Sequence, residues 1–262
     1  MAKLASVKER LHKGYAQTME VTKTLADEKS QYQHIRIFDT VSNGRVMTLD
    51  DIVQITSRDE SAYADMLTHL PILEHGKVER VMIVGGGDLS IADEALKHKT
   101  VKEVVLVDID GRVIELCKQH FAEINAKAFK DKRLKLEVAD AFEYLGRKES
   151  KNRFDLIIAD RPDPVGPGKA LFGETFYDRI KGALKKGGYA TFQTGVPSTS
   201  PGRSPRRWKS CRASSPVRAS ICRWFPPILA VSWRCHGPAR VASRSAPPRA
   251  SAKPRPPISA SS

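Results

Sequence analysis

The sequence predicts an α/β fold, in which a small antiparallel β domain is followed by a parallel sheet with helices on both faces. Two observations predict it. Between residues 80 and 194, short apolar runs alternate with helical patterns, which is typical of a parallel sheet covered on both sides. Ahead of that region, residues 19–56 hold short β-rich runs separated by polar or glycine breaks, which suit antiparallel hairpins.

The amino-terminal strands are predicted from β-rich runs that lie between turn signals such as Ser42-Asn43-Gly44. The expected strands are 19–25, 32–40, 45–50 and 52–57. From Asp59 onward the pattern changes to helical spacing, and this helix is expected to end at Gly76. The periodic apolar residues of the helix are Tyr63, Met66, Leu67, Leu70 and Leu73. We therefore expect a β domain over residues 1–62.

The second region predicts five buried parallel strands joined by helices. The expected strands are 80–87, 103–110, 134–140, 154–160 and 188–194, and the expected helices are 89–98, 111–124 and 172–185. The last helix should stop at Gly187-Gly188. This pattern places a second domain at residues 63–197 and leaves residues 198–262 as a tail.

Acidic residues follow four of the five strands, at the edge where parallel α/β sheets bind their ligands. These acids are Asp88, Asp108 with Asp110, Asp140, and Asp160 with Asp163. The glycines at 85–87 let the backbone approach a ligand, and an acid about 20 residues further on suits ribose hydroxyls. The alternatives are a tight connection and a helix N-cap. The turn is not a GxGxxG motif. Because no GxxxxGK[ST] occurs, a triphosphate P-loop is not expected.

The segment 160–168, DRPDPVGPG, places two carboxylates three residues apart in a loop that proline stiffens. A cationic amine substrate would need carboxylates at this point to bind it, and one positioned to take its proton. The alternative is an ordinary turn with exposed aspartates.

Several ordered motifs together resemble the polyamine aminopropyltransferases, and among them the bacterial spermidine synthases. The resemblance covers about residues 15–197. It is carried by Gln33, GRVMTLD (44–50), VQITSRDE (53–60), Tyr63, MLTHLP (66–71), GGGD (85–88), VDID (107–110) and DRPDPVGP (160–167).

The resemblance implies a Rossmann-like, methyltransferase-type sheet and a defined reaction. An aminopropyl group would pass from decarboxylated S-adenosylmethionine to putrescine, giving spermidine and methylthioadenosine. The sulfonium donor releases a neutral leaving group, so neither a metal nor a cofactor is expected. The resemblance also implies a cytoplasmic homodimer or homotetramer whose ligands are a diamine and a sulfonium nucleoside, with no nucleic acid or membrane as partner.

Family roles carry over onto matching positions of this chain. Because an alkylamine with a pKa near 10 is protonated at neutral pH, a carboxylate must accept its proton before it attacks, and this role falls to Asp160. The diamine would contact Tyr63, Asp88, Asp160 and Asp163. The nucleoside would contact Gln33, Gly85, Gly86, Asp108, Asp140, Ala141 and Pro167. Tyr63 also fits the core face of its helix, and this second reading stays open.

Three departures from the family lower the activity that we expect. Leu89-Ser90 stand where glycine or alanine is common, and the leucine side chain could obstruct the aminopropyl arm. Ala64-Asp65 replace a His-Glu pair, so a histidine that contacts polyamine is absent. Ala141 replaces a glycine.

The net charge of +14 averages two unlike parts. Residues 198–262 hold 13 Lys and Arg with no acid, while residues 1–197 hold 31 basic and 30 acidic residues. The first part therefore gives no reason to expect a polyanion partner. The sequence contains no run of about 18 apolar residues, so no membrane span is predicted, and no secretory signal is seen.

The tail is interpreted as out-of-frame translation. The family continues after the fifth strand with Phe-Tyr-Gln-Pro and later with Pro-Thr-Tyr, and both can be encoded in the frame next to Ser198–Pro201 and Phe225–Gly237. The alternatives are a disordered extension and a basic nucleic-acid arm. Without the closing strands of the family, the strand at 188–194 would be an open edge, and the chain is predicted to fold poorly or to be inactive.

Two other functions remain open at this stage. A methyltransferase that uses ordinary S-adenosylmethionine could share the fold and the acidic strand ends. A non-catalytic remnant could keep only the nucleoside pocket. The paired aspartates of the 160–168 loop favour a diamine over a generic methyl acceptor.

Overall fold

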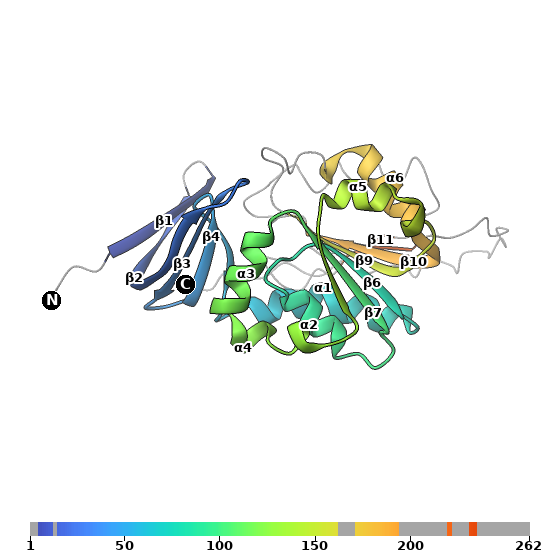
Figure 1. The fold of residues 1–262 in the computed structure, drawn as a ribbon, viewed down its shortest axis with the longest axis horizontal. Helices are drawn as coiled ribbons and strands as arrows, with labels where there is room; N and C mark the ends of the chain where they lie inside the picture. Colours follow the sequence, from blue (N-terminus) through green and yellow to red (C-terminus); the bar gives the residue numbers. More distant parts are fainter. Residues whose placement is uncertain (1–4, 13–14, 162–170, 194–218, 222–230, 235–262) are drawn as a thin grey trace, which may run out of the picture.

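The computed structural model of the protein describes residues 5–12, 15–161, 171–193, 219–221 and 231–234. It contains two sheets that lie side by side (Figure 1). One is antiparallel and formed by the amino-terminal strands, and the other is built on five parallel strands. None of the helices in these ranges is long and apolar enough to cross a membrane.

The amino-terminal sheet has five strands in sequence order, each antiparallel to the next. They are β1 (Ala5–His12), β2 (Tyr15–Lys29), β3 (His34–Thr40), β4 (Gly44–Leu49) and β5 (Ile52–Thr56). The carboxylate of Glu9 is buried and accepts a hydrogen bond from the Val53 amide at 2.8 Å, so the two outer strands approach each other and the sheet curls into a half-barrel.

The expectation that the β region starts at residue 19 is wrong, because β1 precedes it and β2 starts at Tyr15. The β1 sequence, ASVKERLH, has apolar residues at alternate positions 5, 7 and 11, but Glu9 interrupts this alternation. Its pairing with β2 and the buried Glu9 contact hold it in the sheet.

The second sheet has the order β11-β12-β10-β9-β6-β7-β8. Its parallel strands are β6 (Arg80–Gly85), β7 (Glu103–Asp108), β8 (Leu134–Val138), β9 (Phe154–Asp160) and β10 (Leu184–Phe192). This confirms the predicted parallel sheet. From β6 the chain first adds β7 and β8 on one side and then returns to add β9 and β10 on the other side. Parallel sheets of this kind bind ligands at the point where the strand order reverses, which here lies at β6 and β9.

Helices cover both faces of the parallel sheet, with α5 and α6 on one side and α1 and α2 on the other (Figure 1). The helices are α1 (Glu60–His75), α2 (Ser90–Leu96), α3 (Gly111–His120), α4 (Ala122–Asn125), α5 (Ala141–Gly146) and α6 (Glu174–Ala183). Short 3-10 turns occupy Ala128–Lys130 and Lys148–Ser150. The α3 helix packs Val113 and Leu116 against Ile35 and Met47 of the half-barrel, which joins the two parts.

Helix α1 ends at Gly76 as predicted, but its buried face differs from the predicted one. The predicted Leu67 is buried and Tyr63 packs against the core, but Leu70 and Leu73 are exposed, with 37% and 71% of their surface accessible. Ala64 and Ile72, which were not predicted, complete the buried face. Leucine spacing alone could not separate two neighbouring faces of one helix.

Helix α6 ends at Ala183, earlier than expected, and β10 begins at Leu184 rather than at residue 188. Gly187 has a φ of +87° and lies within the strand, where the pairing register with β9 shifts between Leu184 and Tyr189. The two glycines therefore mark an irregularity inside the strand and not the end of the helix. Helix α5 was not predicted.

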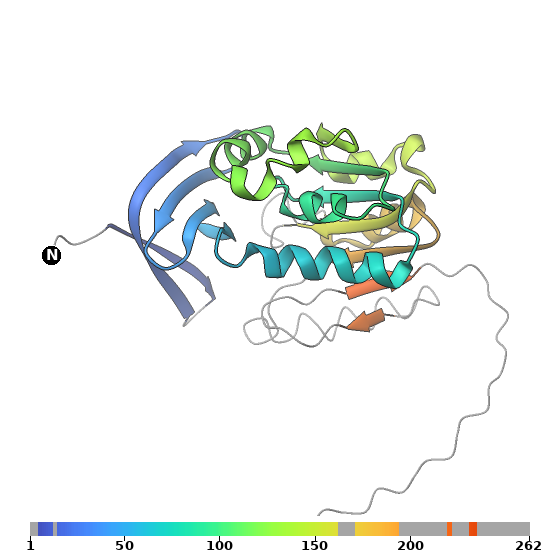
Figure 2. The same cartoon turned by 90° about the horizontal axis from the view of Figure 1, so that it is seen from below.

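Two short strands, β11 (Ala219–Ile221) and β12 (Val231–Arg234), lie beyond β10 at one end of the strand order, as Figure 2 shows. β12 pairs antiparallel with Tyr189 and Ala190 of β10. The expectation of an open edge is therefore wrong at these two residues. Among the described residues, the antiparallel register with β12 covers Tyr189 and Ala190 and does not include Thr191 or Phe192.

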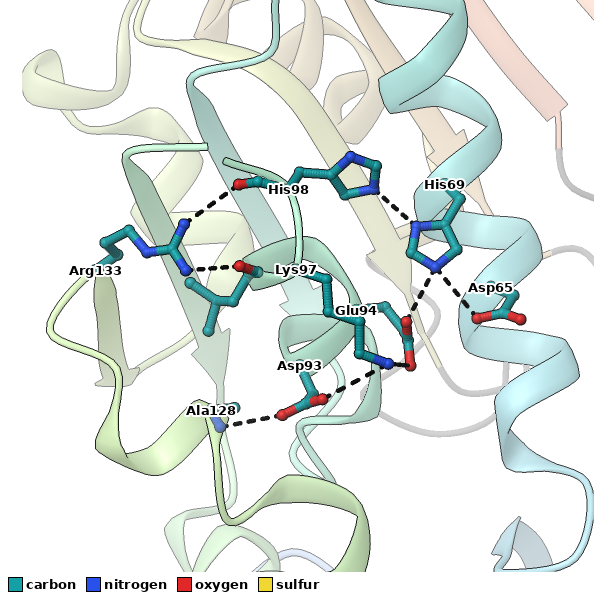
Figure 3. A network of polar contacts seen from close by, with 9 residues as sticks. Asp65, His69, Asp93, Glu94, Lys97, His98, Ala128 and Arg133 are labelled. Atoms are coloured by element: carbon teal, nitrogen blue, oxygen red, sulfur yellow. Dashed lines mark hydrogen bonds and ion pairs between the residues drawn. The ribbon is translucent and has the colours of Figure 1, made fainter. Parts of the chain in front are cut away.

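A polar network fastens α1 to α2 (Figure 3). The His69 ring lies between His98, at 2.7 Å from Nδ1 to Nε2, and Glu94, at 3.0 Å from Nε2 to Oε2. Asp65, one turn earlier on α1, lies 3.3 Å from His69 Nε2. Arg133 donates to the carbonyl oxygen of His98, so the network reaches the start of β8.

Candidate active site

The glycine turn after β6 meets the end of β9 at close range. Gly85 and Asp160 are register partners, and a Cβ on Gly85 would lie 2.1 Å from the Asp160 carbonyl oxygen. A Cβ on Gly86 would lie 3.5 Å from Asp160 Oδ2. Both glycines have positive φ, at +77° and +72°. Their lack of a side chain therefore lets the turn pass directly beside the Asp160 carboxylate.

Asp160 is the most perturbed carboxylate of this region. Its pKa is raised to about 7. Burial is the largest cause and the charges of Asp88 and Asp108 act in the same direction, while a hydrogen bond from Tyr63 acts in the opposite one. The Tyr63 hydroxyl donates that bond to Asp160 Oδ1. Burial and the neighbouring Asp160 charge raise the pKa of Tyr63 well above its usual value, so the phenol stays a donor. A carboxyl group with a pKa near neutrality can exchange a proton at working pH.

Asp88 lies at the centre of this charge pattern. Its Oδ1 accepts a hydrogen bond of 2.7 Å from the Ser90 amide, which fixes the carboxylate over the first turn of α2. Its charge contributes to the raised pKa values of Asp160, Tyr63 and Asp108. Three of the predicted strand-end acids, Asp88, Asp108 and Asp160, are thus electrostatic neighbours in the structure.

Glu60 belongs to the same group of acids and was not among the predicted site residues. Its pKa is raised to about 7, chiefly by burial and then by the charges of Asp88 and Glu94. It lies at the first residue of α1, three positions before Tyr63. Glu60 lies within the motif 53–60, but no pattern in the sequence indicated that its pKa would be raised by the charge of Asp88.

Asp108 ends β7 and is held by backbone donors. Its carboxylate accepts hydrogen bonds from the amides of Asp110, at 2.9 Å, and Gly87. Burial raises its pKa to about 6 even though these hydrogen bonds lower it. A Cβ on Gly87 would lie 2.9 Å from Asp108 Oδ2, so the third glycine gives the carboxylate its room.

Gln33 joins the half-barrel to the parallel sheet. Its Nε2 donates to Asp110 Oδ2 at 2.9 Å, and the Ser30 hydroxyl donates to the same oxygen at 2.6 Å. The other oxygen of buried Asp110 accepts from the Arg112 amide and caps α3. Gln33 also borders an open hollow of about 450 Å³ whose lining is Lys29, Ser30, Gln31, Tyr32, Gln33, His34, Asp50 and Asp51. Sequence reasoning named Gln33 but missed Ser30 and the buried role of Asp110.

Asp140 acts as the N-cap of α5. Its Oδ1 accepts from the amides of Phe142, at 2.7 Å, and Glu143, at 3.4 Å. Ala141 follows as a buried residue at the start of the helix. The cap does not exclude a ligand contact, because the residue is exposed at the end of β8.

Leu89 does not obstruct the site. It adopts a left-handed conformation, with φ of +68°, and its side chain is fully buried in the core cluster that includes Ala64 and Leu67. The expectation that this leucine crowds a bound ligand is therefore wrong. Asp163 and Pro167 lie outside the described residues.

One group of described side chains could hold a metal ion. Potential ligand atoms of Asp65, His69 and Glu94 lie within 4.8 Å of one another. These atoms already contact each other, and Lys97 forms an ion pair with Glu94. We interpret the group as the polar fastening between α1 and α2.

The fold and the site together define a class: a Rossmann-like α/β protein with a group of acids at the ends of its parallel strands. Two family models divide the chain in the same way as its two sheets. "Spermidine synthase tetramerisation domain" matches residues 7–57, and "Spermine/spermidine synthase domain" matches residues 60–230. The chain belongs to the spermine/spermidine synthase family.

Relatives and solved structures agree with this membership. The chain is 44% identical over 189 residues to a polyamine aminopropyltransferase of Ruegeria sp. and 41% identical over 194 residues to polyamine aminopropyltransferase 1 of Pseudomonas aeruginosa, covering 72% and 74% of this chain. These matches cover 66% and 67% of the relatives, so the chain spans about two thirds of their length. A match to the Serratia proteamaculans enzyme of the same name has 36% identity over 235 residues, covering 88% of this chain and 81% of the relative.

Two solved spermidine synthases share the fold. One, in complex with the transition-state analogue AdoDATO, superposes with a TM-score of 0.80 at 29% identity, covering 88% of this chain and 80% of the other. The other, from Thermotoga maritima, has a TM-score of 0.78 at 28% identity, covering 89% and 80%.

Proposed function

We propose that the protein transfers an aminopropyl group from decarboxylated S-adenosylmethionine to putrescine, giving spermidine and methylthioadenosine. The observation that carries the proposal is Asp160: a half-buried carboxylate with a pKa of about 7, held by Tyr63 at the sheet edge beside the glycine turn. Family membership supports the same reaction.

The chemical step needs a neutral amine. Asp88 and Asp163 bind ammonium groups of the diamine, and Asp160 accepts the proton of the attacking nitrogen. The nitrogen lone pair then attacks the aminopropyl carbon next to the sulfonium, and the carbon–sulfur bond breaks. Its electron pair returns to sulfur, which leaves as neutral methylthioadenosine. Atoms and charge balance with Asp160 as the proton acceptor.

The nucleoside is positioned by groups that the fold holds rigidly. Asp108, whose carboxylate is fixed by two backbone amides, accepts hydrogen bonds from the ribose hydroxyls. Gly85 and Gly86 leave room beside the reacting centre. Asp140 and Ala141 contact the adenine, while Gln33 and Pro167 contact the remainder of the nucleoside.

The donor nucleoside is a substrate of this reaction, and no cofactor or metal takes part in the proposed step. The match to a tetramerisation domain supports assembly through the half-barrel, as a homodimer or homotetramer. A cytoplasmic location, and the absence of nucleic-acid and membrane partners, stay predictions from the sequence.

The test compares two donors and follows their products. The protein is incubated with putrescine and either decarboxylated or ordinary S-adenosylmethionine. We expect spermidine and methylthioadenosine in equal amounts with the first donor and no S-adenosylhomocysteine with the second. Asp160→Asn should lower kcat about 10²- to 10⁴-fold, the usual contribution of a general base.

Other outcomes would contradict the proposal. Formation of S-adenosylhomocysteine would support a methyltransferase. Calorimetric binding of methylthioadenosine without any turnover would indicate a remnant that keeps only the nucleoside pocket. Unchanged turnover in Asp160→Asn would remove Asp160 from the mechanism.

A further inference from the structure

The residue after Asp160 is a buried arginine that the proposed reaction does not use. Side chains along β9 alternate between the two faces of the sheet: Ile158 packs in the cluster with Tyr63, whereas Ala159 packs in the cluster on the α6 side. Asp160 continues the first face and meets Tyr63. Arg161 continues the second face and is 2% exposed. The two neighbours are therefore anchored on opposite sides of the sheet.

On its own side, the Arg161 guanidinium lies in a cage of aromatic rings. Its Cζ atom lies 3.9 Å from the ring centroid of Phe172, and 5.1 to 5.6 Å from those of Phe192, Tyr177 and Phe176. Stacked contacts of this kind stabilise a buried guanidinium, and a planar guanidinium suits them better than an ammonium. The cage is built from the segment before α6, from α6 and from β10.

Two hydrogen bonds fix the direction of the guanidinium within the cage. Nη1 donates to the carbonyl oxygen of Leu171, and Nη2 donates to the Tyr177 hydroxyl at 3.1 Å. The chain leaves β9 at Arg161 and Leu171 lies ten residues later. The contact thus ties the end of β9 to the chain that enters α6.

These hydrogen bonds and ring contacts hold the Arg161 guanidinium on the face of the sheet opposite Tyr63. The effect on the reaction that follows from them is one of geometry, because they fix the position of the chain at the end of β9.

We propose that Arg161 is a positioning residue for diamine recognition, which fixes the Asp160 carboxylate from the face opposite Tyr63 by tying the end of β9 to the entry of α6. This inference rests on the proposed function. It predicts that loss of the guanidinium weakens diamine binding, because Asp160 then loses one of its two anchors, while the nucleoside contacts at β6 and β7 stay in place.

The test uses Arg161→Met and Arg161→Lys in the full chain. Arg179→Met is the matched control, because the Arg179 guanidinium also stacks on a ring, 3.6 Å from the centroid of Phe142, and donates to a carbonyl oxygen on the same side of the sheet. Circular dichroism selects a temperature at which all variants are folded. Calorimetry then measures methylthioadenosine binding and, on the loaded protein, putrescine binding.

In Arg161→Met we expect the Kd for putrescine to rise about tenfold, with the Kd for methylthioadenosine within twofold of the original value. The Kd of Arg161→Lys for putrescine should lie between those of Arg161→Met and the unmodified protein. Lysine keeps the positive charge but lacks the forked guanidinium that donates to both Leu171 and Tyr177. Arg179→Met should bind both ligands normally.

Three results would overturn the inference. Unchanged putrescine binding in Arg161→Met would show that the cage does not position the site. An equal loss of both ligands would show a general structural role, as would an equal effect in Arg179→Met. If the unmodified protein bound methylthioadenosine but not putrescine, or neither, the proposed function would fail first and this inference with it.

Discussion

Single residues at the sheet edge set the chemistry. Asp160 ionises near neutrality because burial and the adjacent Asp88 charge disfavour its anionic form, while the Tyr63 hydrogen bond acts in the other direction. An ordinary exposed aspartate would be a much weaker base. The environment of Asp160 therefore matters as much as its identity.

We predict that kcat/KM for the diamine rises with pH through about 7, as Asp160 loses its proton and becomes able to act as a base. In Asp88→Asn the midpoint should shift to lower pH, because a charge that raises the Asp160 pKa is gone. Asp27→Asn, a change at an exposed acid on β2, is the control and should leave the midpoint in place. Initial rates from pH 5.5 to 8.5 measure it, and identical midpoints in all three proteins would contradict the assignment.

Gly85 gives a second prediction at this scale. Gly85 and Gly76 share a φ of +77°, but only Gly85 would place a Cβ 2.1 Å from another backbone atom, whereas nothing lies within 4 Å at Gly76. Gly76→Ala should cost about 1 kcal/mol of unfolding free energy for its left-handed backbone. Gly85→Ala should cost about 1–3 kcal/mol more through the clash with Asp160. Urea denaturation measures both, and equal losses would contradict the close approach.

At the scale of elements, the polar network between α1 and α2 joins two helices that both lead into the site. His98 contacts His69, which in turn meets Glu94 and Asp65. Burial lowers the pKa of His98, and the neighbouring His69 lowers it further, while Glu94 raises it. The folded protein therefore favours the neutral ring.

Because the pKa of His98 is lower in the folded chain, the unfolded chain binds its proton first as the pH falls. We predict that this group removes stability as the pH drops below about 6.5, the ordinary histidine pKa. His98→Asn should flatten the fall in unfolding free energy between pH 7 and pH 5, measured by urea denaturation. A variant with the same slope as the unmodified protein would show that His98 does not contribute.

At the scale of the whole molecule, the buried Asp160 carboxylate lowers the free energy of unfolding at neutral and higher pH. An unfolded aspartate ionises near pH 3.9, whereas Asp160 in the folded chain ionises near 7, so its contribution to stability falls as the pH rises between these values. We predict that Asp160→Asn is more stable than the unmodified protein at pH 8, by on the order of 1 kcal/mol or more. The gain should shrink at pH 4.5. Guanidinium denaturation at both pH values measures it, and a variant that is less stable at pH 8 would contradict the burial argument.

The tail remains a separate prediction at this scale. If residues 198–262 are translated out of frame, sequencing of the gene should show a single-base change near codon 197. A chain with the frame restored should then be more soluble and turn over faster than this one. A nucleotide sequence that encodes this tail, with no family-like continuation in the neighbouring frame, would remove the hypothesis.

Apolar runs predicted the parallel sheet because β6, β7 and β9 are buried on both faces and need no alternation. The same approach missed β1, whose polar sequence is held by pairing and by Glu9, and it misplaced the buried face of α1. It also could not decide between the two readings of Tyr63. Only the fold showed that the Tyr63 hydroxyl reaches Asp160.

The α/β class, the family and the set of acids at the strand ends could be predicted from the sequence, because they depend on residue type and order along the chain. Three features became visible only in the folded chain: which acids influence one another, that Leu89 turns into the core, and that Arg161 is anchored away from its neighbour Asp160. Proximity, burial and the direction of a side chain arise only when strands distant in sequence pair, so no local pattern could supply them.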